Sequence, residues 1–254
     1  MTASGEKALT NDRMLGVLGG MGPLASAQFM LRLTLLTPAA RDQDHIPAVL
    51  WSDPRVPDRT RGRQGNGEDP LPALLRGIAG LRAAGCGAIA IPCNTAHGWY
   101  AELRAAAGCP ILHIVDAAAA ELRRAAIPPG PIGVMGTAAT LAMRLYQDRL
   151  GAQGWECLVP PEDHMRRLVT PAIAAVKANQ VAAAYAPLAE AARGLAARGA
   201  QAVVLGCTEI PLGLAAGPPA AGAPLIDTAA AGTLLIDTID ALARAAIAWA
   251  RPAV

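Results

Sequence analysis

Short apolar runs alternate along this chain with longer segments in which apolar residues recur at helical spacing. The strand-like runs cover residues 14–19, 46–51, 86–91, 110–115, 132–135, 155–159 and 201–205, with a last short one at Leu225–Ile226. The helical segments end near residues 36, 84, 107, 126, 150, 197 and 250, and the one spanning 161–197 is expected to break near Asn179. Strands that alternate with helices predict parallel sheets with crossover helices. We therefore expect an α/β fold.

The alternating pattern stops once and then starts again. The break is the segment Pro128-Pro129-Gly130-Pro131, which neither a helix nor a central strand accommodates. A restart predicts two pseudo-symmetric lobes, each a parallel sheet flanked by helices, with an active site in the cleft between them. We expect the N-terminal lobe to contain residues 1–114 and 226–254, because the final helix returns to it. The C-terminal lobe would then contain residues 115–225.

A cysteine follows one apolar run in each lobe. Cys93 comes after the run 86–91, Cys207 comes after the run 201–205, and each leads into a segment that can be helical. Open α/β sheets bind ligands beyond the carboxyl ends of their strands. The N–H groups and dipole of a helix N-terminus also stabilise a thiolate there. The two positions therefore indicate one thiol from each lobe facing a shared cleft.

Composition excludes several classes of protein. The 254 residues are 53% hydrophobic and 17% charged with a net charge of +2, which indicates a folded chain and argues against nucleic-acid or anionic-membrane partners. Asp237, Asp240 and Arg244 interrupt the most apolar segment, 229–250, so we expect no membrane helix and a cytoplasmic protein. The cysteines are odd in number and lack C-x-x-C spacing, which favours free thiols.

The first glycine-rich turn formally fits a dinucleotide fingerprint. It reads G-x-G-x-x-A from Gly20 to Ala25, but Pro23 removes an N–H that could hold phosphate. The acidic residue after the second strand, Asp53, also comes later than the usual spacing of about 20 residues. We prefer a tight turn that lets the backbone approach a small ligand. The loop 52–67 that follows is long enough to act as a lid or binding loop.

Two facing thiols permit three kinds of chemistry. Cys93 and Cys207 with His97 and Glu209 could bind zinc, although the spacing is loose. A single nucleophilic cysteine would leave the second thiol without a role. In a two-base proton transfer, one thiolate removes an α-proton and the other thiol returns one to the opposite face. Buried structural cysteine is the plain alternative. It fits the three remaining cysteines better: Cys86, Cys109 and Cys157.

Five motifs occur in register from about residue 14 to residue 228: LGGMGPLA at 18–25, RDQDH at 41–45, PDRT at 57–60, PCNTAH at 92–97 and GCTE at 206–209. Together they resemble one family, the cofactor-independent aspartate/glutamate racemases, and within it the aspartate racemases. The resemblance implies a homodimer that needs neither cofactor nor metal and acts on a small amino acid, aspartate or glutamate.

The resemblance also assigns roles to residues. It implies that Cys93 and Cys207 are the acid/base pair and that Arg59 and Lys177 hold the distal carboxylate of the substrate. Only one lysine besides Lys177 occurs in the chain, which gives that residue added interest. The remaining expected substrate-binding residues match the α-carboxylate groups or the pocket lining of the family: Asn94, Thr95, Thr208, Met21, Ser52 and Thr140.

Other functions stay open at this point. The same fold could racemise glutamate or a broad range of amino acids, and relatives decarboxylate malonates or isomerise maleate. The presence of both thiols disfavours the decarboxylases, which use a single cysteine. A catalytically silent amino-acid-binding protein is the alternative from a different class.

Overall fold

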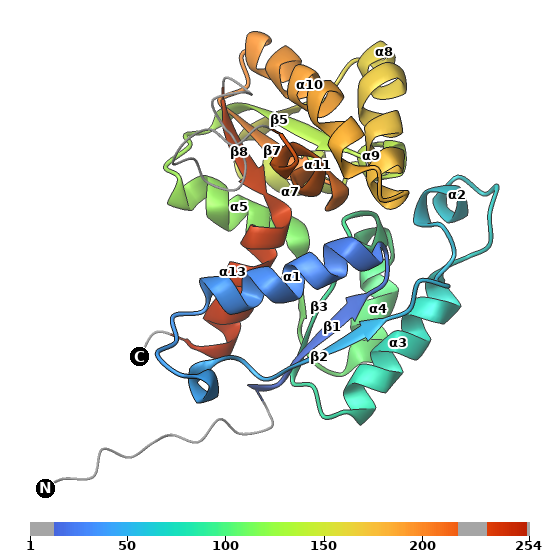
Figure 1. Ribbon diagram of the computed structural model, residues 1–254, viewed down its shortest axis with the longest axis vertical. Coiled ribbons are helices and arrows are strands. Elements are labelled where there is room, and N and C mark those ends of the chain that lie inside the picture. The colour runs from blue at the N-terminus through green and yellow to red at the C-terminus, as the bar shows by residue number, and fades with distance from the viewer. Residues whose placement is uncertain (1–12, 218–232, 253–254) are drawn as a thin grey trace, which may run out of the picture.

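The computed structural model describes residues 13–217 and 233–252, which form two lobes (Figure 1). Each lobe has a four-stranded sheet in which every neighbouring pair is parallel. The first sheet has the order β2 (Ala48–Ser52), β1 (Leu15–Gly19), β3 (Ala88–Ala90), β4 (Ile111–Leu112). The second has the order β6 (Trp155–Leu158), β5 (Gly130–Gly136), β7 (Ala202–Gly206), β8 (Leu234–Asp237). The identical order confirms the predicted α/β fold and relates the two lobes strand by strand.

Helices connect the strands within each lobe. Those of the first lobe and its exit are α1 (Pro23–Leu36), α2 (Arg59–Arg63), α3 (Leu71–Ala83), α4 (Tyr100–Ala107) and α5 (Ile114–Arg124). Those of the second are α6 (Ala138–Ala142), α7 (Leu145–Gly151), α8 (Glu162–His164), α9 (Thr170–Lys177), α10 (Tyr185–Ala197) and α11 (Glu209–Ala215), and α13 (Thr238–Ala250) ends the fold. Short 3₁₀ turns cover Asp42–Asp44, Thr95–Trp99 and Val181–Ala184, and a π-helical turn covers Met165–Val169.

Two helical segments are divided, one of them where no break was expected and the other where the sequence predicts one. Arg144, at a φ of 55°, separates α6 from α7 within the region predicted as one helix. Asn179, at a φ of 60°, ends α9 at the position where the sequence predicts a break. Asparagine tolerates this left-handed conformation better than most residues, which accounts for the second break. The strand expected at Leu225–Ile226 lies outside the described residues.

The last strand differs from the expected division of the chain. We assigned residues 226–254 to the N-terminal lobe, but β8 pairs with β7 in the second sheet. The chain therefore crosses back to the N-terminal lobe only after Asp237, where α13 begins and runs down beside α1 (Figure 1). The sequence misleads here because the apolar residues of β8 continue without a break into the apolar face of α13.

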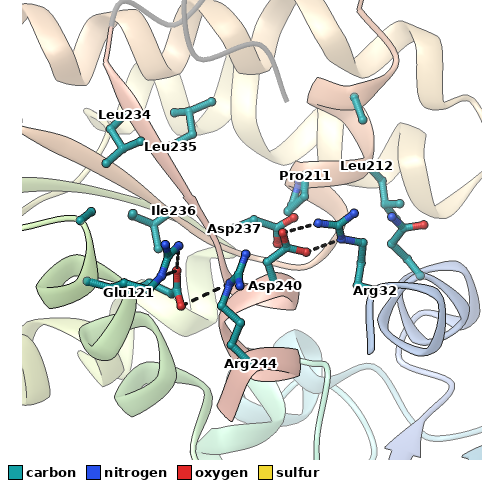
Figure 2. Close-up of a pocket in the computed structure, with 14 residues that line it drawn as sticks. Arg32, Glu121, Pro211, Leu212, Leu234, Leu235, Ile236, Asp237, Asp240 and Arg244 are labelled. Carbon is teal, nitrogen blue, oxygen red and sulfur yellow. Dashed lines mark hydrogen bonds and ion pairs between the residues drawn. The ribbon is translucent and has the colours of Figure 1, made fainter. Parts of the chain in front are cut away.

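Ion pairs fasten α13 to the helices around it. Arg32 on α1 donates through Nε and Nη2 to both carboxylate oxygens of Asp240, at 2.5 and 2.6 Å. Glu121 on α5 pairs with Arg124 and lies 3.6 Å from Arg244 on α13 (Figure 2). These residues surround a cavity of about 1000 Å³, open mouth included, in which the carboxylates of Glu121 and Asp240 already have arginine partners. Charge pairing at this place holds the lobes together by way of α13.

One hydrophobic core runs through both lobes. Phe29 of α1, Val17 of β1 and Ile114 of α5 pack in the same buried cluster as Val134 of β5 and Leu242 of α13. Two further clusters fill the outer layers of the individual lobes. The shared core fixes how the lobes face each other and hence what lies between them. Among the described residues, none of the helices combines the length and apolar character needed to cross a membrane.

Candidate active site

Four equivalent strand ends meet at one small pocket between the lobes. Met21 follows β1, Cys93 follows β3, Thr137 follows β5 and Cys207 follows β7, and all four line the pocket. In each sheet the chain leaves the first strand in one direction and returns on its other side. Such a switch point is where open α/β sheets bind ligands. Here the two switch points face each other and share a space of about 270 Å³, open mouth included.

Most of the residues expected at the site do lie at this pocket. They are Met21, Arg59, Cys93, Asn94, Thr95, Lys177, Cys207 and Thr208. The two thiol side chains are almost enclosed, since Cys93 is 5% exposed and Cys207 is 4% exposed. The pocket therefore excludes most bulk water from the sulfur atoms, and a ligand inside it would contact both lobes at once.

Cys207 has a carboxylate as its hydrogen-bond partner. Its Sγ donates to Oε2 of Glu209 at 3.0 Å. Burial, together with the negative charge of Glu209 and this hydrogen bond, raises the pKa of Cys207 well above its usual value. The positive charge of Lys177 works in the opposite direction. We expected a helix N-terminus to bring this thiol towards neutrality. Burial and the adjacent carboxylate, however, outweigh the dipole of α11, and Cys207 carries its proton.

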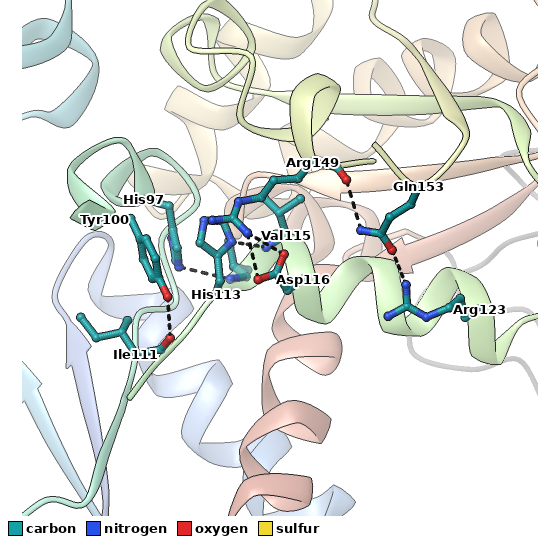
Figure 3. Close-up of polar contacts among 10 residues, drawn as sticks. His97, Tyr100, Ile111, His113, Val115, Asp116, Arg123, Arg149 and Gln153 are labelled. Carbon is teal, nitrogen blue, oxygen red and sulfur yellow. Dashed lines mark hydrogen bonds and ion pairs between the residues drawn. The ribbon is translucent and has the colours of Figure 1, made fainter. Parts of the chain in front are cut away.

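His97 supports the backbone of Cys93 and does not touch its sulfur. Its Nδ1 lies 2.9 Å from the carbonyl oxygen of Cys93, and its Nε2 accepts a hydrogen bond from the N–H of Ile114 at 3.2 Å (Figure 3). Nδ1 must therefore carry the proton and donate. Burial lowers the pKa of His97 to about 4, so the ring is neutral. Both ring nitrogens are occupied, which argues against the zinc site considered from the sequence.

Aromatic rings enclose this histidine. The ring centroid of His113 lies 4.8 Å from that of His97 (Figure 3). The ring of Tyr100 stacks on His97 and meets the ring of His113 edge to face. His113 caps α5 by accepting from the N–H of Val115 at 3.2 Å. Burial, and then the charge that His97 would carry, lowers the pKa of His113 to about 2. Two neutral histidines thus join the Cys93 loop to the helix that leaves the first lobe.

Arg59 is buried and keeps part of its guanidinium free. Its Nη1 donates to the carbonyl oxygens of Val56 and Pro57, both at 3.1 Å, and its Nη2 donates to the carbonyl oxygen of Met21 at 3.2 Å. Its Nε is buried and has no hydrogen-bond partner among the described residues. Nε–H and the second Nη2–H lie on the same edge of a guanidinium. That edge can bind a carboxylate through two parallel hydrogen bonds.

The pocket also carries a second cation and a second carboxylate. Lys177, at the end of α9, and Asp58, at the start of α2, face it from opposite lobes. Burial opposes the charge on Asp58, but the N–H of Arg61 and the positive charges of Lys177 and Arg59 together lower its pKa. With Arg59 and Glu209, the lining therefore contains two positive and two negative side chains.

The residue after each thiol reaches across to the opposite lobe. Asn94 donates through Nδ2 to Oγ1 of Thr238 at 3.3 Å and accepts at Oδ1 from the hydroxyl of Tyr146 at 2.5 Å. Thr208 donates to the carbonyl oxygen of Pro92 at 3.3 Å. Asn94 keeps one Nδ2 hydrogen for a ligand. The two reciprocal contacts fasten each cysteine loop to the lobe that holds the other cysteine.

A group of hydroxyls closes the pocket beside Cys93. Oγ1 of Thr95 lies 3.0 Å from Oγ1 of Thr137 and 2.9 Å from Oγ1 of Thr140. Thr137 also caps α6, because its Oγ1 accepts from the N–H of Thr140 at 3.1 Å. Thr95 comes from the first lobe and its two partners from the second, so these contacts also span the cleft.

Two N–H groups of the glycine-rich turn after β1 already donate to side chains of the protein. The N–H of Gly20 donates to Oγ of Ser26 at 2.9 Å, and the N–H of Gly22 donates to Oε1 of Glu209 at 3.2 Å. Gly20 has a φ of 87°, and a Cβ there would lie 2.4 Å from the carbonyl oxygen of Asp53. The glycine is required by this close approach. A carboxylate of the protein occupies the N–H that a dinucleotide phosphate would need, which agrees with the interpretation as a tight turn.

Two expected pocket residues lie elsewhere. Ser52 is exposed at the end of β2 and lines a separate shallow hollow. β2 is the outermost strand of its sheet, so its carboxyl end lies away from the crevice. Thr140 is fully buried behind the lining, where it holds Thr95 and Thr137. Its hydroxyl faces these threonines because it belongs to the first turn of α6.

The structure adds pocket residues that were not expected there from the sequence. They are Asp58, Thr60, Thr137 and Glu209. Thr137 could have been found from the symmetry of the lobes, since it follows β5 as the glycine-rich turn follows β1. Glu209 belongs to the motif after Cys207 but was considered only as a metal ligand. The hydrogen bond between Glu209 and the thiol has no signature in the sequence.

Comparison with known proteins now assigns the fold and the site to a family. The model of the Asp/Glu/Hydantoin racemase family matches residues 18–245. The chain belongs to this family. This confirms the resemblance found in the sequence motifs, and because the family consists of racemases, the chain is an isomerase.

Individual members of the racemase family show how far the similarity extends. The aspartate racemase of Picrophilus torridus is 30% identical, with a TM-score of 0.78 over 93% of this chain and 94% of that one. The broad specificity amino-acid racemase RacX of Bacillus subtilis is 32% identical over 170 residues, which are 65% of this chain and 71% of RacX. A glutamate racemase of Francisella tularensis, solved with D-glutamate, shares the fold at 16% identity and a TM-score of 0.65, over 93% of this chain and 80% of that one.

Proposed function

We propose that this racemase interconverts L- and D-aspartate by proton transfer between Cys93 and Cys207, without pyridoxal or another cofactor. The observation that carries the proposal is the position of the two thiols. They come from equivalent strand ends of opposite lobes, and both line one enclosed pocket that also contains Arg59. Two acid/base groups on opposite sides of one carbon are what inversion of an α-centre requires.

The reaction needs one thiolate and one thiol at the start. The thiolate removes the α-hydrogen as a proton, and the electron pair of the broken C–H bond stays on the substrate as a carbanion. The second thiol then gives its own proton to the opposite face of the α-carbon. The product has inverted configuration, and the two sulfur atoms have exchanged protonation states. The reverse reaction uses the same groups with their roles swapped.

Glu209 supports an assignment of starting roles. It holds Cys207 in the protonated form. Cys207 is then the acid and Cys93 the base for the enantiomer whose α-hydrogen faces Cys93. The opposite enantiomer needs Cys207 as the thiolate and Cys93 as the thiol, which are the protonation states that conversion of the first enantiomer leaves behind. N–H donors and cations around the pocket offset the charge that develops on the carbanion.

Arg59 supports aspartate as the substrate. Its buried, unpartnered Nε offers a hydrogen bond to a carboxylate, and the low polarity of the surroundings strengthens such a bond. Lys177 adds a second positive charge on the opposite wall. A broad-specificity racemase is the second candidate. It is favoured by the similarity to RacX and by Asp58 and Glu209, whose negative charges give the pocket no excess of positive charge.

Exchange of the α-hydrogen tests the proposal directly. The protein is incubated in D₂O with L- and D-forms of aspartate, glutamate and neutral amino acids, without cofactor. Deuterium incorporation and loss of optical activity are then recorded. We expect both with aspartate. Exchange that is faster with other amino acids supports the broad-specificity candidate. Binding without exchange identifies a non-catalytic amino-acid-binding protein and contradicts the proposal.

Substitution of each thiol tests the two-base scheme. We expect Cys93→Ser and Cys207→Ser each to lower the rate of racemisation by about a thousandfold, within the range known for loss of a general acid or base. Cys109→Ser, which changes a thiol away from the pocket, is the matched control. Full activity in either pocket variant contradicts a mechanism that needs both sulfur atoms.

We also propose that the racemase is a homodimer in the cytoplasm. Leu24, Leu31 and Leu35 are 41%, 51% and 61% exposed and lie on one face of α1, which offers apolar surface to a second copy. Sedimentation equilibrium tests the assembly, and a monomer at micromolar concentration contradicts it. Cell fractionation tests the location.

A further inference from the structure

Tyr146 lies beneath the active site and is in contact with both cysteine loops. It belongs to α7 and is fully buried. It is not among the residues that line the pocket. Its two contacts involve Asn94, the residue that follows Cys93, and Gly206, the residue that precedes Cys207.

The hydroxyl of Tyr146 fixes the loop of Cys93. It donates to Oδ1 of Asn94 at 2.5 Å. The other end of the same amide donates to Oγ1 of Thr238 at 3.3 Å, and that hydroxyl donates to the carbonyl oxygen of Leu205 at 2.8 Å. The amide of Asn94 is therefore held at one end by Tyr146 of α7 and at the other by Thr238 at the start of α13. Its position sets that of Cys93, one residue away.

The ring of Tyr146 fixes the loop of Cys207. A Cβ placed on Gly206 would lie 3.0 Å from Cε2 and 3.4 Å from Cζ of the tyrosine, so the ring lies directly against this glycine. The same Cβ would lie 2.9 Å from the carbonyl oxygen of Met135. Gly206 is thus confined between strand β5 and the ring. Any displacement of Tyr146 is passed to the peptide that leads into Cys207.

The chemistry of the side chain suits a permanent donor. Burial, followed by the charges that Cys207 and Cys157 would carry as thiolates, raises the pKa of Tyr146 well above its usual value. The phenol therefore keeps its proton while the thiols exchange theirs. Asn94 cannot lose its partner through ionisation during the reaction, so the contact stays the same in both directions.

We propose that Tyr146 is a positioning residue that sets the two thiols in register across the cleft. Its hydroxyl locates the Cys93 loop through Asn94, and its ring locates the Cys207 loop through Gly206. This inference rests on the proposed function, since register matters because both sulfur atoms must reach the same carbon. Proton transfer depends steeply on the distance and angle between the reacting atoms.

The variant Tyr146→Phe tests the proposal with a matched control. It removes the hydroxyl and keeps the ring. Tyr100→Phe removes a comparable hydrogen bond, from the Tyr100 hydroxyl to the carbonyl oxygen of Ile111 at 3.2 Å, away from the pocket. For Tyr146→Phe we expect kcat to fall about ten- to hundredfold with KM changed less than about threefold, because Arg59 still binds the substrate. The deuterium isotope effect on kcat at the α-position should rise. Tyr100→Phe should change neither.

A second measurement does not depend on turnover. Iodoacetamide labels buried thiols only when the surrounding structure opens, so labelling rates report how firmly each loop is held. Tyr146→Phe should raise the labelling rate of Cys93 at least threefold, with Cys109 as the internal reference, and that of Cys207 less, because the ring that lies against Gly206 remains. Thr238→Val, which removes the partner at the other end of the Asn94 amide, should act in the same direction and serves if Tyr146→Phe does not fold.

The outcomes separate the two proposals. An unmodified protein that does not exchange α-hydrogens contradicts the racemase function, while the labelling rates still decide the role of Tyr146. An active protein in which Tyr146→Phe matches Tyr100→Phe in kcat, isotope effect and labelling overturns the positioning role and leaves the racemase function standing. A loss of thermal stability without these changes also overturns it.

Discussion

The thiol of Cys207 donates a hydrogen bond of 3.0 Å to Oε2 of Glu209. The other oxygen of the same carboxylate, Oε1, accepts from the N–H of Gly22 in the first lobe at 3.2 Å. One side chain therefore sets the protonation of a thiol and ties the glycine-rich turn to the opposite lobe. The charge of Glu209 can be removed without changing the size of its side chain, which makes both roles accessible to experiment.

Glu209→Gln should lower the pKa of Cys207. The amide keeps a hydrogen-bond acceptor beside the thiol but no longer repels a thiolate, and a neighbouring charge of this kind shifts a pKa by about one unit or more. The rate of alkylation of Cys207, followed by mass spectrometry against pH, should therefore rise at lower pH than in the unmodified protein. Asp58→Asn removes a charge from the same pocket, but Asp58 is not the hydrogen-bond partner of Cys207, so this variant should shift the pH profile less. An unchanged profile in Glu209→Gln contradicts the assigned cause.

Arg59→Ala should distinguish acidic from neutral substrates. Loss of a charge-assisted, bidentate contact costs about 1.5–3 kcal/mol, so kcat/KM for aspartate should fall about ten- to a hundredfold or more. The kcat/KM for alanine or serine should change far less. Arg55→Ala is the control from the same loop, since that side chain is 87% exposed and pairs with Asp53. Equal losses on aspartate and alanine would show that Arg59 supports the loop and does not hold the distal carboxylate.

Stability should fall on acidification because His97 is held neutral. Its pKa drops from 6.5 to about 4 on folding, so the unfolded chain takes up a proton that the folded chain refuses. The free energy of unfolding therefore falls as the pH is lowered from about 6.5 to about 4, by about 3 kcal/mol for this group. His97→Asn retains a donor to the carbonyl of Cys93 and should reduce the acid dependence in urea titrations. His113, whose pKa is about 2, should account for the acid dependence of stability that remains.

Asp237 should oppose this dependence over part of the same range. Burial, followed by the charge of Asp240, raises its pKa from 3.8 to about 7, although its carboxylate also caps α13 at the N–H of Ile239. The folded chain then holds a proton that the unfolded chain releases, so this contribution to stability is lost as the pH rises from about 4 to about 7. The melting temperature of Asp237→Asn should therefore exceed that of the unmodified protein by more at pH 8 than at pH 5. An equal difference at both pH values would contradict the raised pKa.

The sequence was informative wherever a residue follows directly from a strand. Cys93 and Cys207 were placed at equivalent strand ends by the alternation of apolar runs alone, and the structure places both at one pocket. The family resemblance placed Ser52 at the pocket, but Ser52 lies outside it at the end of β2, an edge strand, and strand order within a sheet is not visible in a local pattern. The apolar pattern also failed for β8, whose apolar residues merge with those of the following helix.

Other features depend on contacts between residues that are distant in the chain. Glu209 and Gly22, and Tyr146 and Asn94, meet only after both lobes have folded and packed through α13. The pKa of Cys207 was expected to fall because a helix N-terminus follows it. It is raised instead, since burial and a carboxylate at hydrogen-bond distance outweigh a dipole that acts through less direct geometry.

The order of apolar and polar residues by itself determined the α/β class, the duplicated lobes and the position of a thiol at the end of one strand in each. These depend on local periodicity, which the chain carries in every segment. Only the tertiary structure decided that the two thiols share an enclosed pocket, that burial and a neighbouring carboxylate keep one of them protonated, and that a buried tyrosine lies against both loops. Burial and charge proximity are set by the packing of segments far apart in sequence, so they arise only once the chain is folded.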